Sequence, residues 1–214
     1  MDPTVLYNLT YGLYVVGVMD GERPVGCVIN TCYQVTSQNP ILAISLNKNN
    51  FTLDAIRRNR RYSLSILNED SDPTVIGTFG FHSSRDTDKY ADYGYDIISG
   101  TPVVRGTFAG RLILEALDFV DCETHVLVLG RLVDTDAGEG TPMTYAYYHK
   151  VIKGKAPKNA PTYREEKPEE KPAASNLTKY RCDLCGYEVE VEGELPADFT
   201  CPLCGASRDQ FSKV

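Results

Sequence analysis

The apolar residues of this chain gather in short runs rather than at helical spacing. Runs rich in β-branched and aromatic residues, each ended by turn-forming residues, predict strands at 12–18, 25–35, 40–46, 61–67, 111–120 and 124–134. Short helices are predicted at 51–59, 72–80 and 84–92. Many short strands with few helices favour a closed or half-closed antiparallel barrel, so the predicted fold class is mainly β.

This pattern ends near residue 154. Residues 155–177 are rich in Pro, Glu, Lys and Ala and carry almost no bulky apolar side chains. Such a segment buries too little surface to order itself and is typical of a flexible linker. The sequence therefore predicts a barrel domain at 1–154, a linker at 155–177 and a small second domain at 178–214.

Composition narrows the class of protein. A hydrophobic content of 42% supports a buried core, and a net charge of −7 argues against binding to nucleic acid or to an anionic membrane. The basic cluster at 57–61 is expected to be the solvated end of the predicted helix. No apolar run is long enough to span a membrane, and we do not expect the first residues to form a signal peptide. We therefore expect a cytoplasmic protein whose cysteines are reduced.

Four of the seven cysteines form two Cys-x-x-Cys pairs near the C-terminus, namely Cys182, Cys185, Cys201 and Cys204. A domain of about 37 residues is too small to be held by a hydrophobic core alone, so a metal bound by four thiolates is expected to hold it together. A glycine follows each pair, which predicts a tight turn with positive φ and backbone N–H groups aimed at sulfur. This spacing fits structural zinc as well as mononuclear iron. The other three cysteines, Cys27, Cys32 and Cys122, are expected to be buried small hydrophobic residues.

The residues around the two pairs resemble rubredoxin. The pattern is Tyr-Arg-Cys182-x-x-Cys185-Gly-Tyr, followed by Cys201-Pro-x-Cys204-Gly and Phe211. The segment between the pairs is shorter than in standalone rubredoxins, and Phe199 stands where those usually have tryptophan. In this respect the chain is closer to rubredoxin modules fused to other redox proteins. The resemblance implies an iron ion held by four cysteines, and the short cover over the metal keeps zinc as an alternative.

The N-terminal domain resembles the flavin reductase family of FMN-binding split barrels, over segments 30–67, 77–90, 124–134 and 142–151. In domain order, the whole chain is similar to the high-molecular-weight rubredoxins. The resemblance implies that Ser45, Asn47, Lys48 and Thr52 hold the FMN phosphate and ribityl chain. It further assigns Asn30, Thr31 and Thr36 to the isoalloxazine or ribityl hydroxyls, and Ser83, Ser84, Arg85 and Lys89 to a second loop that adds charge and closes the site.

The chemistry of the first segment agrees with a phosphate site. A lysine and hydroxyl groups at the start of the predicted helix at 51–59 suit an anion, because helix N-termini present free N–H groups. Without the resemblance, Lys48 and Thr52 would be interpreted as an ordinary solvated loop and helix cap. The resemblance also places His125 near the flavin or the nicotinamide as a candidate catalytic residue, against the alternative of a structural histidine in a strand. His149 and its neighbouring tyrosines are expected to line the flavin or to form an aromatic core or interface.

Together the two domains predict an electron relay. A flavin accepts a hydride and releases single electrons, whereas one tetrathiolate iron carries one electron. The predicted order is NAD(P)H to FMN, FMN to iron, and iron to an external acceptor such as a flavodiiron protein. The resemblance implies a homodimer with the flavin at the interface. Two alternatives remain: a flavin-binding module with a zinc-ribbon tail and no turnover, and a flavin or ferric reductase that does not use its tail as a relay.

Overall fold

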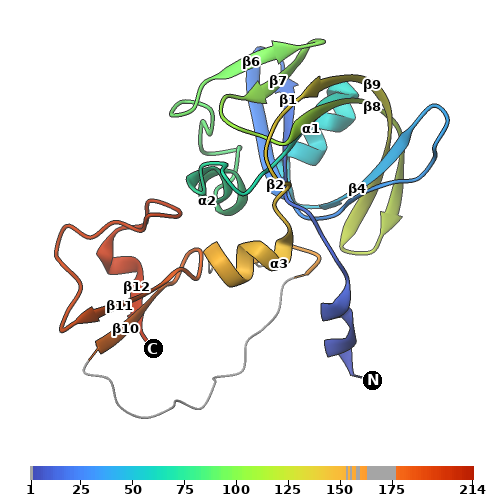
Figure 1. The fold of residues 1–214 in the computed structure, drawn as a ribbon. Coiled ribbons are helices and arrows are strands. Elements are labelled where there is room, and N and C mark those ends of the chain that lie inside the picture. The colour runs from blue at the N-terminus through green and yellow to red at the C-terminus, as the bar shows by residue number, and fades with distance from the viewer. Residues whose placement is uncertain (1, 153, 155, 158–159, 163–176) are drawn as a thin grey trace.

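The computed structural model describes residues 2–152, 154, 156–157, 160–162 and 177–214, which form a large β domain and a small C-terminal one (Figure 1). Most of the predicted linker, residues 163–176, lies outside the described residues, so its flexibility stays a prediction. None of the helices in the described part of the chain is long and apolar enough to cross a membrane.

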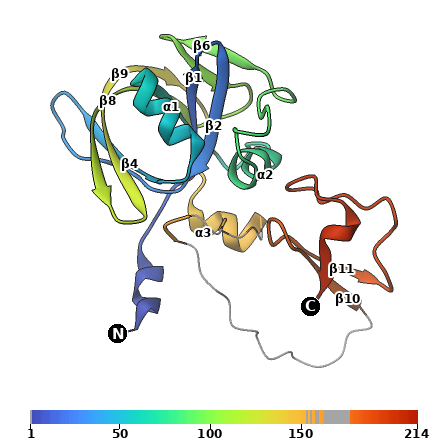
Figure 2. The same ribbon diagram turned by 180° about the vertical axis from the view of Figure 1, so that it is seen from behind.

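The large domain is built on one antiparallel sheet of seven strands in the order β2-β1-β5-β8-β9-β4-β3, curled into a half-barrel (Figures 1 and 2). The mainly β prediction is confirmed. The strands are β1 (Tyr14–Asp20), β2 (Arg23–Ile29), β3 (Cys32–Gln34), β4 (Ile41–Asn47), β5 (Arg61–Ile66), β8 (Gly110–Cys122) and β9 (His125–Ala137). A separate hairpin pairs β6 (Tyr95–Ile98) with β7 (Thr101–Val104), which the apolar runs did not predict.

The two edge strands of the sheet are consecutive in sequence. The predicted strand at 25–35 is divided into β2 and β3 by Asn30 and Thr31, and this connection takes the chain from one edge of the sheet to the other. Register shifts within β8 and β9 help to bend the long central ribbon. Its inner face is apolar, with Leu114 and Val128 fully buried. The barrel is therefore split where Asn30 and Thr31 lie.

Two of the three predicted helices are present. In α1 (Phe51–Asn59), the side chain of Asn50 caps the first turn by accepting a hydrogen bond from the Thr52 N–H at 3.0 Å. The basic cluster lies at the end of α1, as predicted, and α2 (Thr74–Phe81) follows β5. The helix predicted at 84–92 is wrong, because this segment forms turns. Side chains of Ser83 and Asp88 bond to backbone N–H groups two residues on, which competes with helix formation.

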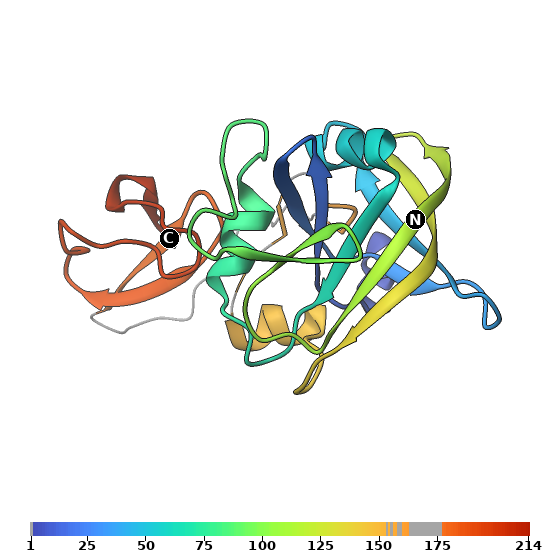
Figure 3. The ribbon, with the colours of Figure 1, turned by 90° about the horizontal axis from the view of Figure 1, so that it is seen from above.

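Several short elements were not predicted. They are η1 (Pro3–Asn8), α3 (Tyr145–Tyr147) and a turn of π-helix, η2 (Tyr148–Ile152), which continues α3. The small domain contains β10 (Leu177–Cys182), β11 (Glu188–Glu192), η3 (Arg208–Gln210) and β12 (Phe211–Lys213), with the strands in the order β11-β10-β12. Viewed from above, the small domain lies beside α2 (Figure 3).

Candidate metal centre and cofactor site

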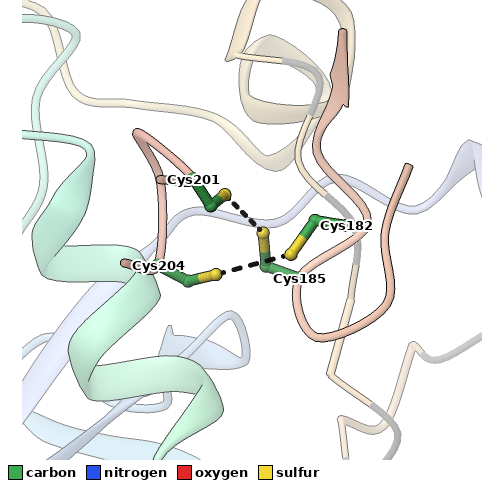
Figure 4. Close-up of side chains that lie close together, drawn as sticks. All are labelled: Cys182, Cys185, Cys201 and Cys204. Carbon is green, nitrogen blue, oxygen red and sulfur yellow. Dashed lines mark hydrogen bonds between the residues drawn. The ribbon is translucent and has the colours of Figure 1, made fainter. Parts of the chain in front are cut away.

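The four predicted ligands converge in the small domain (Figure 4). The sulfurs of Cys182, Cys185, Cys201 and Cys204 all lie within 4.8 Å of one another. The Sγ atoms of Cys182 and Cys204 are 3.7 Å apart, and those of Cys185 and Cys201 are 3.5 Å apart. A tetrahedral ion with metal–sulfur bonds of about 2.3 Å requires sulfur separations of about 3.8 Å. The four side chains therefore fit one tetrahedral metal ion.

Each pair of cysteines forms the same backbone turn. Gly186 N–H donates to the Cys182 carbonyl at 2.8 Å, and Gly205 N–H donates to the Cys201 carbonyl at 2.9 Å. Both glycines have the predicted positive φ, 76° and 72°. Backbone N–H groups also donate to the sulfurs, among them Tyr187 to Cys185. Such hydrogen bonds stabilise thiolate charge and tune a redox-active metal.

The four cysteine sulfurs lie close enough to hydrogen-bond to one another and share protons. The pKa of Cys201 is lowered, first by the thiols of Cys185 and Cys204, which donate hydrogen bonds to its sulfur, and then by backbone N–H groups. The pKa of Cys185 is raised, chiefly because its proton is held in this contact with Cys201. A metal ion replaces the shared protons and is bound by thiolates, so metal binding releases protons and contributes to folding.

Few apolar side chains surround the metal centre. Phe199 and Phe211 meet edge to face with ring centres 5.3 Å apart, and Leu203 and Ala206 are buried among the cysteines. Phe199 occupies the position at which the resemblance leads one to expect tryptophan. A core this small supports the view that the metal contributes most of the stability of this domain.

In the large domain, positive charge gathers at the start of α1. The guanidinium groups of Arg23, Arg58 and Arg85 each lie 5.6–5.7 Å from the centre of the Phe51 ring. Arg58 is paired with Asp20 at 2.7 Å, whereas Arg85 is exposed. Arginines near the positive end of a helix dipole form a suitable site for phosphate. Sequence analysis missed Arg23, because a single arginine at the start of a strand carries no motif.

The second predicted loop, 83–89, contributes in two ways. Ser84 bonds to the backbone of Gly26 through its hydroxyl, which accepts from the N–H at 3.1 Å and donates to the carbonyl at 2.8 Å. Lys89 donates to the carbonyls of Gly26 and Phe79 at 2.9 Å and 3.0 Å, and burial lowers its pKa to about 8. Ser84 and Lys89 therefore attach the loop to β2. Ser83 and Arg85 are exposed.

Three predicted residues meet where β4 ends beside β9. Asn47 is the strand partner of His125, whose Nδ1 lies 2.9 Å from the Thr124 hydroxyl. Lys48 donates its backbone N–H to the carbonyl of Thr124 and forms an ion pair with Asp121 at 2.6 Å. The structure thus brings His125, Asn47 and Lys48 together, and Lys48 is paired with the carboxylate of Asp121 at the surface.

Other predicted flavin contacts lie in the split of the barrel. The Thr31 hydroxyl donates to the Asn30 side chain at 3.0 Å, and the Ser45 N–H donates to the Thr31 carbonyl at 3.4 Å. Thr52 is 1% exposed, and its hydroxyl has no hydrogen-bond partner among the described residues. Thr36 lies apart from this group, in the loop between β3 and β4, where it donates to the Asn39 carbonyl at 3.2 Å.

The remaining candidates have structural partners. Cys27 is buried, and burial raises the pKa of the half-buried Cys32 to about 12, so both thiols are unreactive. The prediction that Cys122 is buried is wrong: this residue ends β8 at a hairpin tip and is exposed. The Nδ1 atom of His149 lies 2.7 Å from the Gly154 carbonyl oxygen. Its ring meets the Tyr145 ring in a T-shaped contact, with ring centres 4.3 Å apart.

Comparison with known proteins agrees with this two-part organisation. The family described as flavin reductase like domain matches residues 6–155, and the family described as rubrerythrin, rubredoxin-like domain matches residues 180–212. The high molecular weight rubredoxin of Moorella thermoacetica is 36% identical over 100% of both chains. The chain belongs to the high-molecular-weight rubredoxin family. As a member of this family, it is a flavin reductase-like oxidoreductase.

Further relatives cover the large domain. The ferric-chelate reductase (NAD(P)H) of Archaeoglobus fulgidus is 34% identical over 78% of this chain and 100% of its own. An FMN-binding protein from Thermus thermophilus with bound p-hydroxybenzaldehyde matches with a TM-score of 0.57 at 24% identity, covering 63% of this chain and 76% of that one. The flavin reductase PheA2 matches with a TM-score of 0.57 at 19% identity, covering 67% and 93%. These two solved structures share the fold of the barrel domain.

Proposed function

We propose that this protein is an electron-transfer oxidoreductase that takes electrons from NAD(P)H onto FMN in the barrel and passes them to an iron ion in the C-terminal domain. An external redox protein then removes them. The observation that carries this proposal is the presence of a four-thiolate centre beside a flavin reductase-like domain in the same chain (Figure 3).

The neighbouring domain favours iron over zinc. Zinc has no redox chemistry and would serve only as a structural ion. The backbone N–H groups directed at the sulfurs of Cys185, Cys201 and Cys204 are the kind of contact that tunes the potential of an iron–thiolate centre. An iron ion at this position gives the tail a role in the reaction of the barrel.

When bound, FMN supplies the conversion between two-electron and one-electron chemistry. One hydride from NAD(P)H reduces two ferric ions to ferrous ions in succession and leaves one proton. Because the chain holds one iron, the external acceptor must reoxidise it between the two steps. We expect a flavodiiron protein as this acceptor, from the family resemblance.

The residues that we assign to FMN divide by chemistry. Arg23, Arg85 and the N-terminus of α1 provide positive charge for the phosphate, supported by their common position around Phe51. The buried Thr52 hydroxyl lies beside the Cys27 thiol, and its assignment to FMN rests on the family resemblance. The flavin ring and ribityl chain are assigned to the split of the barrel, contacted by Asn30, Thr31, Ser45 and Asn47, and His125 is assigned to the nicotinamide side. The assignment of Thr36 rests on the family resemblance alone, because Thr36 lies apart in the loop between β3 and β4. We further propose a homodimer with the flavin at its interface.

The test uses full-length protein purified from iron-replete cells and loaded with FMN. We expect one iron per chain, a red colour, and bleaching of the iron absorption after anaerobic addition of NADH or NADPH. Protein that contains zinc alone, with zinc also in the native source, contradicts the relay. A ferric iron that stays oxidised while FMN is reduced contradicts it as well.

The similarity to the ferric-chelate reductase supports a second candidate, in which the barrel alone reduces ferric chelates. Cys185→Ser separates the two functions. A barrel-only reductase retains full ferric-chelate reduction in this variant, whereas a relay loses electron delivery to the external protein acceptor.

A further inference from the structure

The second pair of cysteines lies against α2 of the barrel domain (Figures 3 and 4). The contact is made by the turn at 201–205 and centres on Gly77. A Cβ atom at position 77 would overlap the carbonyl oxygen of Leu203 and would lie 2.7 Å from the Cα of Cys204. Phe81 of α2 and Ile152 of η2 pack against the same cluster of cysteines. We call Gly77, Phe81 and Ile152 the docking seat.

Gly77 is not needed for backbone conformation. It lies inside α2 and does not have a positive φ, so any residue fits its backbone geometry. Glycine in a helix interior costs about 1 kcal/mol relative to alanine. What glycine provides at this position is space, because the atoms that a side chain would meet belong to a backbone turn and cannot rotate away. Gly80 in the same helix differs: its nearest neighbours would be Val28 at 3.7 Å and Pro157 at 3.9 Å, which are ordinary contacts.

The docked turn is connected to the split of the barrel. Tyr148, which is 2% exposed, lies within electrostatic range of Cys185, Cys201 and Cys204. Its ring is nearly parallel to that of Tyr145, with centres 6.2 Å apart. The Tyr145 hydroxyl accepts a hydrogen bond from Thr162, which accepts one from Asn30. A chain of hydrogen bonds and ring stacking therefore runs from Asn30, a proposed flavin contact, to Tyr148, which interacts electrostatically with three of the metal ligands.

We propose that the docking seat is an intramolecular binding site for the metal-bearing turn at 201–205, and that it holds the iron in the position in which the flavin reduces it. The transfer part of this proposal rests on the relay proposed above. In the docked state one electron passes from reduced flavin to the ferric ion, which becomes ferrous. The external acceptor reoxidises it, and the second electron follows in the same way. Gly77 is thus a positioning residue, since it touches neither cofactor.

The experiment compares Gly77→Ala with the matched control Gly80→Ala in the full-length protein loaded with iron and FMN. Both changes raise helix propensity in α2 by a similar amount. Hydrogen–deuterium exchange measures docking independently of electron transfer. We expect at least fivefold faster exchange in the peptide containing residues 201–205 for Gly77→Ala, and wild-type exchange for Gly80→Ala. Ile152→Ala removes an apolar side chain from the same contact without altering α2. This variant replaces Gly77→Ala in the comparison if Gly77→Ala does not fold.

Stopped-flow absorption then measures function. In Gly77→Ala, iron reduction after NADH addition should slow at least tenfold, while reduction of FMN stays as in wild type. Equal exchange in the three proteins would overturn the docking seat. Faster exchange with an unchanged rate of iron reduction would show that the docked position is not the one used for transfer. If NADH reduces no iron in the wild-type protein, the relay fails, and the exchange measurement still decides whether the seat exists.

Discussion

Lys89 provides a sharp test of how the proposed flavin site is built. The resemblance to flavin reductases assigns this lysine to the cofactor, whereas the structure leaves it only 3% exposed and bonded to the carbonyls of Gly26 and Phe79. Burial lowers its pKa to about 8, and the nearby Cys27 partly opposes the shift. Replacing Lys89 with Met keeps the length and apolar stem of the side chain and removes the titrating amine.

The magnitude follows from the pKa difference between the folded and unfolded chain. An unfolded lysine has a pKa of about 10.4, and each unit corresponds to about 1.4 kcal/mol, so the buried charge costs about 3 kcal/mol below pH 8. Between pH 8 and 10.5 the unfolded chain binds a proton that the folded chain has released, so the free energy of unfolding rises with pH. We expect wild type to gain roughly 2–3 kcal/mol relative to Lys89→Met between pH 7 and 10.

The assay is urea unfolding of both proteins at pH 7, 8, 9 and 10, followed by far-UV circular dichroism. Groups that titrate equally in both proteins contribute equally to both free energies of unfolding, so their contributions cancel when the two are subtracted. If the free energies of unfolding of wild type and Lys89→Met differ by the same amount at every pH from 7 to 10, burial does not lower the pKa of Lys89. If Lys89→Met also lowers FMN affinity tenfold or more, Lys89 adds charge to the flavin site, as the resemblance implies.

Three further predictions address the two cofactors. Arg85→Ala should weaken FMN binding ten- to a hundredfold, or about 1.5–3 kcal/mol, with little effect on riboflavin binding, as measured by fluorescence titration. The control Arg131→Ala, at another exposed arginine, should leave FMN binding unchanged. Cys185→Ser should abolish stoichiometric metal binding and unfold the C-terminal domain, whereas Cys122→Ser should retain the metal, as judged by metal analysis and circular dichroism. The first-order rate of iron reduction after NADH addition should stay constant over a tenfold range of protein concentration, and a proportional rise would mean that electrons cross between molecules.

The sequence predicts well those features that depend on neighbouring residues. The strands follow from local apolar runs, and the metal ligands follow from two spacings of three residues with a glycine after each pair. The helix predicted at 84–92 failed for a reason that is also local, since Ser83 and Asp88 form side-chain bonds to the backbone that a helical pattern does not reveal. The exposure of Cys122 follows from its position at a hairpin tip, which composition does not indicate.

Features that depend on contacts between distant segments could not be predicted. Arg23 joins Arg85 only because the 83–89 loop packs on β2. The role of Lys89 within the protein depends on the carbonyl of Gly26, which lies in another element. Gly77 has the same limitation, because its neighbour Leu203 belongs to a separate domain. A sequence shows which residue types are present, but it does not show that a glycine faces another backbone.

The size of the docking contact suits a relay. In the proposed relay, the metal centre must stay near the flavin long enough to be reduced, and must then leave to meet an external acceptor. A contact made by Gly77, two partly buried apolar side chains and one turn is too small to hold two separate proteins together. Within one chain, however, a tether raises the effective concentration to the millimolar range. A contact with a dissociation constant of about 1 mM, or about 4 kcal/mol, is then occupied roughly half of the time. A tighter seat would delay release to the acceptor, so we expect weak docking to be the arrangement that supports turnover.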